Sequence, residues 1–172
     1  MSTTSTPAVF DALVAEIAQN HPGGRILVAV DGADPRSARR FAGELADAIR
    51  ASGTPAFRAS AERPEQYTSD EDASLLRAVL AGFREGTLER DDDITQIPDD
   101  AVLIVDGRFL LSPRLRGAWH FRIWLEGDGV LSEADDEQQL RYVSDREPRA
   151  TAEAAYDVSV PERPVRIYSD SC

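Results

Sequence analysis

Residues 25–42 read RILVAVDGADPRSARRFA, and this stretch decides the fold class. Residues 26–30 form a short continuous apolar run, which is typical of a strand that is buried on both faces of a parallel sheet. A turn that contains Gly32 follows, and the apolar spacing beyond it predicts an amphipathic helix over 37–51. The order of strand, glycine turn and helix therefore predicts an α/β protein.

The same alternation continues along the chain. Further strands are predicted at 55–60, 101–106 and 121–125, with a fifth near 154–158 and a strand-like stretch at 165–168. Helices are predicted at 9–20 and 73–83, and a helical turn at 113–118. We expect one domain over 1–172, a three-layer αβα fold with a mostly parallel sheet, and flexible residues 1–6. The polar stretches 61–72 and 91–93 are expected to be loops, and 127–139 is acidic and weakly patterned.

Charge excludes several classes of partner. The chain of 172 residues has 31 acidic and 19 basic residues, so its formal net charge is −12. This balance argues against nucleic acids and anionic membranes as partners, because both are polyanions. All 19 basic residues are arginine, so no mechanism that needs a lysine is open to this chain.

Cysteine and histidine are scarce. The single cysteine is Cys172, which rules out an intrachain disulfide, and the only histidines are His21 and His120, so no metal site is expected. The first residues lack the pattern of a signal peptide, and no apolar run approaches the ~20 residues of a membrane span. We expect a cytoplasmic protein.

Candidate site residues follow three of the predicted strands. Ligands of open α/β sheets bind at the carboxyl ends of the strands, where Asp31-Gly32, Ser60 and Asp106-Gly107 lie. A phosphate-binding loop of the pattern G-x-x-x-x-G-K-[ST] would fall on Gly32–Arg39. Only the first glycine fits, because the remaining motif positions hold Ser37, Ala38 and Arg39.

Four stretches of the chain nevertheless resemble the uridine kinase branch of the P-loop nucleoside kinases. They are RILVAVDG at 25–32 leading to Phe41-Ala42, FRAS at 57–60, DAVLIVDGRFLL at 100–111 continuing to Trp119, and RIYSDSC at 166–172. They occur in the family's order and span almost the whole chain. The resemblance implies a P-loop NTPase-like fold with a five-stranded parallel sheet, in which 25–31 lies between 101–106 and 121–125. It also implies ATP-dependent phosphorylation of a nucleoside.

The resemblance also assigns roles to residues, and several of the expected groups are missing. Asp106 matches the acidic residue that ends the third strand, and Glu62 is the only carboxylate near the position of the catalytic base. The lid falls on 126–140, which contains no arginine. The phosphate loop lacks its lysine and its hydroxyl. Restoring lysine at position 38 alone is expected to bring no large gain, whereas Ala38→Lys with Arg39→Thr is expected to rebuild nucleotide binding without turnover.

These observations favour a catalytically inactive protein that binds a nucleoside or a phosphate-bearing small molecule, or that has a regulatory role. The candidate binding residues are Gly32, Arg36, Ser37, Arg39 and Arg40, with no metal and no cofactor assigned. One alternative is an active uridine kinase that uses these arginines with ATP and Mg²⁺. The other is an interaction domain without a small ligand. Self-association into a homo-oligomer is also expected.

Overall fold

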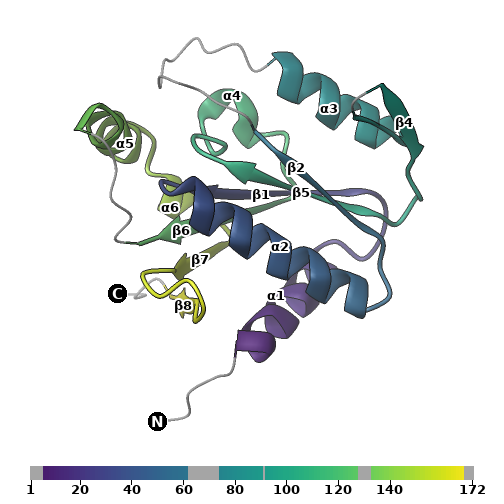
Figure 1. Ribbon diagram of the computed structural model, residues 1–172, viewed down its shortest axis with the longest axis horizontal. Coiled ribbons are helices and arrows are strands. Elements are labelled where there is room, and N and C mark those ends of the chain that lie inside the picture. Colours follow the sequence, from purple (N-terminus) through teal and green to yellow (C-terminus); the bar gives the residue numbers. More distant parts are fainter. Residues whose placement is uncertain (1–5, 62–73, 91, 128–132, 169–172) are drawn as a thin grey trace.

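The computed structural model describes residues 6–61, 74–90, 92–127 and 133–168 (Figure 1). Helices and strands alternate along most of this chain. The elements are α1 (Thr6–Asn20), β1 (Ile26–Gly32), α2 (Pro35–Ala51), β2 (Ala56–Ser60), α3 (Ser74–Glu85), β3 (Thr87–Arg90), β4 (Asp93–Gln96), β5 (Val102–Gly107), α4 (Pro113–Arg116), β6 (Phe121–Glu126), α5 (Glu133–Arg146), α6 (Pro148–Thr151), β7 (Ala154–Asp157) and β8 (Val165–Ile167). None of the helices in this part of the chain is long and apolar enough to cross a bilayer.

The main sheet has the strand order β2-β5-β1-β6-β7-β8. Neighbouring strands pair in parallel across the first five positions of this order, β2, β5, β1, β6 and β7. Strand β1 lies between β5 and β6, as the resemblance implied. The prediction of five strands was one short, because β8 adds antiparallel to the edge of β7. Only seven residues join β7 to β8, and so short a connection permits an antiparallel pair but no parallel crossover.

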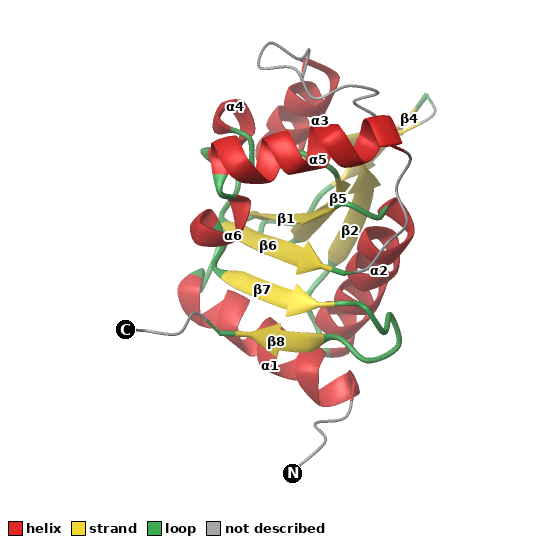
Figure 2. Ribbon diagram, turned by 90° about the vertical axis from the view of Figure 1, so that its left-hand side faces the viewer, coloured by secondary structure: helices red, strands yellow, loops and turns green. Residues whose placement is uncertain are grey.

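Two apolar layers cover the two faces of the sheet. Helices α1 and α2 pack on one face around Phe10, Phe41 and Phe121, and the opposite face is covered by α3 and by the segment between β5 and β6 (Figures 1 and 2). Strands β1 and β5 are buried along their whole length, which explains their continuous apolar sequence. The three-layer αβα prediction is therefore confirmed.

One local prediction was wrong and two elements were not predicted. Residues 93–96 form β4, which pairs with β3 as an antiparallel hairpin; of the expected loop at 91–93, Asp92 lies in the turn and Asp93 begins β4. Helix α5 covers part of the segment 127–139, for which no element was predicted. Thr6, expected to be flexible, begins α1 and donates a hydrogen bond to the carbonyl of Glu162 at 2.7 Å.

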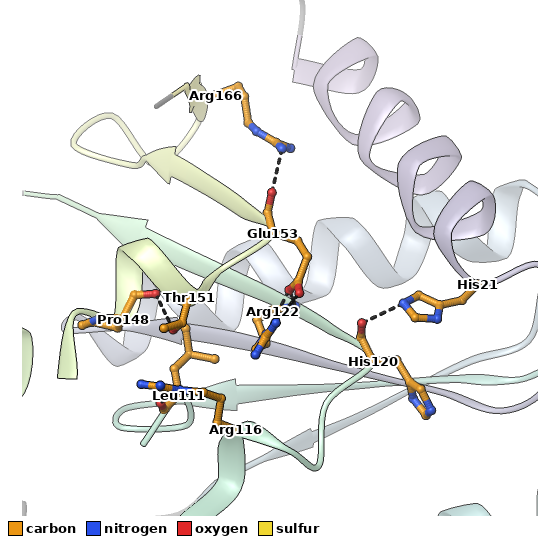
Figure 3. A network of polar contacts seen from close by, with 9 residues as sticks. All are labelled: His21, Leu111, Arg116, His120, Arg122, Pro148, Thr151, Glu153 and Arg166. Atoms are coloured by element: carbon orange, nitrogen blue, oxygen red, sulfur yellow. Dashed lines mark hydrogen bonds and ion pairs between the residues drawn. The ribbon is translucent and has the colours of Figure 1, made fainter. Parts of the chain in front are cut away.

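A histidine pair joins the end of α1 to the opposite edge of the sheet from the candidate site. His120 Nδ1 accepts a hydrogen bond from the Leu27 amide at 2.9 Å, and the His21 ring donates from Nε2 to the His120 carbonyl at 2.7 Å (Figure 3). Partial burial lowers the pKa of His120, and the nearby His21 and Arg84 lower it further. The neutral ring is the form that fits, because protonated Nδ1 would point a second donor at the Leu27 amide.

We expect this pair to make the protein less stable in mild acid. The unfolded chain takes up a proton on His120 near the ordinary pKa of about 6.5, before the folded chain does, so stability falls as the pH drops through this range. Urea unfolding above and below pH 6.5 measures this effect. As the pH is lowered, the free energy of unfolding should fall more for the unaltered protein than for His120→Gln. An equal loss in both proteins would contradict the assignment.

Candidate functional site

The structure brings the predicted edge residues together at the carboxyl ends of three neighbouring strands. Ser60 of β2 pairs in register with Asp106 of β5, and Asp106 pairs with Val30, the residue before Asp31 in β1. The turn from β1 into α2 lies at the same edge. The candidate catalytic residue Glu62 lies outside the described residues.

The segment that would form a phosphate loop is a tight turn into a capped helix. Only Ala33 and Asp34 separate β1 from α2, which begins at Pro35. The Asp34 carboxylate accepts hydrogen bonds from the amides of Arg36 at 3.1 Å and Ser37 at 3.3 Å, and from Ser37 Oγ at 2.7 Å. Partial burial raises the pKa of Asp34, but the hydrogen bonds from Ser37 and Arg36 outweigh it and hold the pKa below its ordinary value. Amides that bind a phosphate in other helices here bind a carboxylate of the chain itself.

Ala38, the position of the missing lysine, belongs to the core. Its side chain is fully buried in the apolar layer under α2. A Cβ atom added to Gly32 would lie 3.7 Å from the Ala38 Cβ and 3.2 Å from the Leu125 Cβ, so β1 and α2 are in close contact here. This geometry contradicts the expectation that Ala38→Lys with Arg39→Thr would rebuild a nucleotide cradle, because position 38 faces the sheet.

The three candidate arginines of α2 do not converge on one point. Arg40 forms ion pairs with Glu44 and Glu162 at 3.0 and 2.9 Å. Arg36 is exposed in the first turn, and Arg39 lines a separate cavity along β2. The cavity that Gly32, Asp34 and Ser37 do line has a volume of about 140 Å³. This is below the ~300 Å³ at which ligand pockets usually begin.

Asp106 is engaged by protein groups on both carboxylate oxygens. Its side chain is buried, Ser60 Oγ lies 3.1 and 3.0 Å from the two oxygens, and Arg58 Nη2 lies 3.4 Å from one of them. Within the described part of the chain, no group of three histidine, cysteine or acidic residues could hold a metal ion. A guanidinium therefore supplies the positive charge next to this carboxylate, and the donors present do not fit a bound Mg²⁺.

A second buried carboxylate, that of Asp31 in β1, connects three elements near this edge of the sheet. It accepts hydrogen bonds from Tyr142 Oη at 2.6 Å and from the amides of Phe109 and Leu111, both at 3.1 Å. Burial raises the pKa of Asp31 to about 6, against the lowering effect of the Tyr142 hydroxyl and the two amides. Asp31 thus joins β1, the loop after β5 and helix α5. The sequence marked Asp31 as an edge residue but gave no sign of its partner 111 positions away.

Helix α5 occupies the stretch expected to be the lid. Gln139 and Tyr142 of this helix are buried, and Gln139 Oε1 accepts a hydrogen bond from Arg108 at 3.3 Å. The Tyr142 ring packs against Phe109 and Trp124. Side chains of the helix thus contact the core below the edge of the sheet, and Arg141 pairs with Glu137 of the same helix.

Comparison with known proteins supports the fold assignment. A structure of a possible uridine kinase from Bacillus stearothermophilus superposes with a TM-score of 0.62 and 16% identity, covering 85% of this chain and 96% of that one. A candidate fructose transport system kinase from Silicibacter sp. TM1040 superposes with a TM-score of 0.51 and 19% identity, covering 83% and 85%. No family model and no curated protein matches the sequence. The chain therefore has a uridine kinase-like P-loop kinase fold.

Proposed function

We propose that this protein is an inactive relative of such kinases, which binds a nucleoside or a phosphate-bearing small molecule, or acts as a regulator, and does not transfer phosphate from ATP. The observation that carries the proposal is the Asp34 cap. The Asp34 carboxylate accepts hydrogen bonds from the amides of Arg36 and Ser37. A phosphate that binds at the start of α2 would have to displace this negatively charged group.

Three further features support the loss of transfer. Position 38 holds a buried alanine where a lysine would contact phosphate, Arg58 and Ser60 occupy the oxygens of Asp106, and Arg40 is held by two glutamates. Phosphoryl transfer depends on positioning and on cancelling the charge of the β- and γ-phosphates. Removing one such donor typically costs about 10²–10³ in rate, so losing several leaves little catalysis.

A radiolabelled phosphate-transfer assay tests the proposal. With Mg²⁺-ATP and uridine or cytidine, we expect no nucleoside monophosphate above the background of a protein-free control. Calorimetric titration should likewise show no low-micromolar binding of Mg²⁺-ATP. Mg²⁺-dependent product that disappears in Asp106→Ala would overturn the proposal and favour the alternative, an active kinase with an arginine-based phosphate loop.

The remaining alternative is an interaction domain without a small ligand. Melting temperatures measured with and without ligand distinguish it from the proposed ligand-binding protein. A ligand that binds the folded protein raises its melting temperature, whereas a domain with no ligand site shows no such shift. Nucleosides and nucleoside monophosphates are the compounds to screen. The cytoplasmic location and self-association expected from the sequence stay predictions.

A further inference from the structure

We propose that a second cavity, away from the turn at Gly32, is a binding site for a small phosphate-bearing anion. This arginine cavity has a volume of about 480 Å³ and lies along the edge strand β2, between α2 and the β3–β4 hairpin. Its lining residues are Arg39, Arg50, Phe57, Arg58, Ala59, Ser60, Leu88, Arg90 and Thr95. The volume falls within the ~300–1,000 Å³ that is usual for ligand pockets.

The charge of this lining is opposite to that of the chain. Four of the nine described lining residues are arginine and none is acidic, although the net charge of the protein is −12. Arg50 pairs with Asp47, and Arg58 with Asp106. Among the described residues, the guanidinium groups of Arg39 and Arg90 have no ion-pair partner. Positive charge is thus concentrated at one place, where it can attract an anion that the rest of the surface repels.

Three of the four arginines are held in place before any ligand arrives. Arg58 Nη2 donates to the Arg39 carbonyl at 2.8 Å, and Arg90 donates to the Arg58 carbonyl. Arg50 donates to the Ala56 carbonyl from two nitrogens, at 3.1 and 2.8 Å. Arg58 also passes over Gly43, where an added Cβ atom would lie only 3.2 Å from Arg58 Nη1. Groups that are already ordered lose less conformational entropy on binding, which favours affinity.

The chemistry of the lining points to phosphate. Guanidinium groups bind phosphate oxygens through paired hydrogen bonds, and the hydroxyl of Thr95 supplies a further donor. Phe57 adds an aromatic side chain to the same wall, against which the organic part of a phosphate ester can pack. The phosphate can belong to an inorganic oligophosphate or to an organic ester such as a nucleotide. The site rests on the binding role in the proposed function, for which it names a place and a ligand class, but it does not depend on the loss of ATP-driven transfer.

Calorimetric titration of the full chain with sodium pyrophosphate, without Mg²⁺ and at low ionic strength, tests the site. We expect binding that weakens at least tenfold in Arg39→Gln and in Arg90→Gln, since each variant loses a charge-assisted hydrogen bond to the anion. Arg141→Gln is the matched control, because it removes the same charge from an exposed position of a helix and does not line the cavity. It should change the affinity by less than about twofold.

Titrations with two kinds of phosphate compound identify the class of ligand. A nucleoside monophosphate that binds more tightly than pyrophosphate would assign the site to an organic phosphate, and the reverse order to an inorganic oligophosphate. Absence of pyrophosphate binding, an equal loss in Arg141→Gln, or equally tight binding of citrate would overturn the phosphate site. Melting temperatures verify that both variants are folded. Phosphate transfer in the separate ATP assay would contradict the proposed function and leave this result unaffected.

Discussion

Replacing Asp31 with alanine is expected to lower the free energy of unfolding by about 2 kcal/mol at neutral pH. The change removes the carboxylate that accepts hydrogen bonds from the Tyr142 hydroxyl and the Phe109 amide, whereas the Leu111 amide still donates to Tyr142 Oη at 3.1 Å. Each orphaned donor costs about 1–3 kcal/mol. Against this, the variant no longer buries a carboxylate whose pKa is raised from 3.8 to about 6, which recovers about 3 kcal/mol. The orphaned donors outweigh that recovery.

Chemical denaturation of Asp31→Ala and Tyr142→Phe measures this effect. Tyr142→Phe removes one donor to the carboxylate and the second acceptor of the Leu111 amide, but both amides still donate to the carboxylate, so its loss should be about 1 kcal/mol. If Asp31→Ala were no less stable than Tyr142→Phe, the assigned role of the carboxylate would be wrong. A loss confined to Asp31→Ala would also identify the contact that positions the Phe109 backbone, whose φ of 62° is unusual for a phenylalanine.

The pH dependence of the same carboxylate has the opposite sign to that of His120. Because the folded-state pKa of Asp31 is raised, the folded chain holds this proton after the unfolded chain has lost it. The contribution of Asp31 is therefore full below pH 3.8 and is lost as the pH rises through about 6. The difference in stability between the unaltered protein and Asp31→Ala should accordingly be larger near pH 4 than near pH 7.

The sequence predicted the sheet because its central strands are buried on both faces. Strands β1 and β5 appear as continuous apolar runs, which need no partner to be recognised. Helix α5 was not predicted because, among its residues whose burial the structure describes, only Gln139 and Tyr142 are buried, too few to produce a helical period. The hairpin β3–β4 escaped for a similar reason, since every residue of β4 is exposed and no alternation marks it.

The candidate site was predictable in position but not in detail. The carboxyl edge that carries Ser60 and Asp106 follows from the order of strands and helices. The cap at Asp34 was not predicted, since the helix was expected to begin at 37, although Asp followed by Pro is a favoured pair at an N-cap and the first helical position. The approach of Arg39, Arg58 and Arg90 to one cavity was not visible, since it depends on how α2 and the hairpin pack beside β2.

The start of α2 connects this cap to the loss of the phosphate loop. The segment from Gly32 to Arg39 has the length of the G-x-x-x-x-G-K-[ST] motif, yet helix α2 begins at Pro35 and takes up most of it. Proline fixes φ near the helical value and has no amide to offer a phosphate. Residues that would wrap an anion in an open loop are therefore already part of a helix, and their side chains follow the helical period.

Because position 38 is part of helix α2 and faces the core, a lysine placed there cannot act as a phosphate-loop lysine. We expect Ala38→Lys to destabilise the protein by about 3 kcal/mol without any gain in Mg²⁺-ATP binding. Ala38 is fully buried, and α2 and β1 approach each other closely beside it at Gly32. A lysine there must displace packed side chains and either lose its charge or force an opening to solvent. Arg39→Lys is the control, because it places a lysine at the next, exposed position and should change stability by less than about 0.5 kcal/mol. Denaturation curves and calorimetry on both variants decide the matter: an Ala38→Lys protein that stays fully stable and binds Mg²⁺-ATP would show that α2 can open into a phosphate loop, and the inactive-kinase proposal would lose its main support.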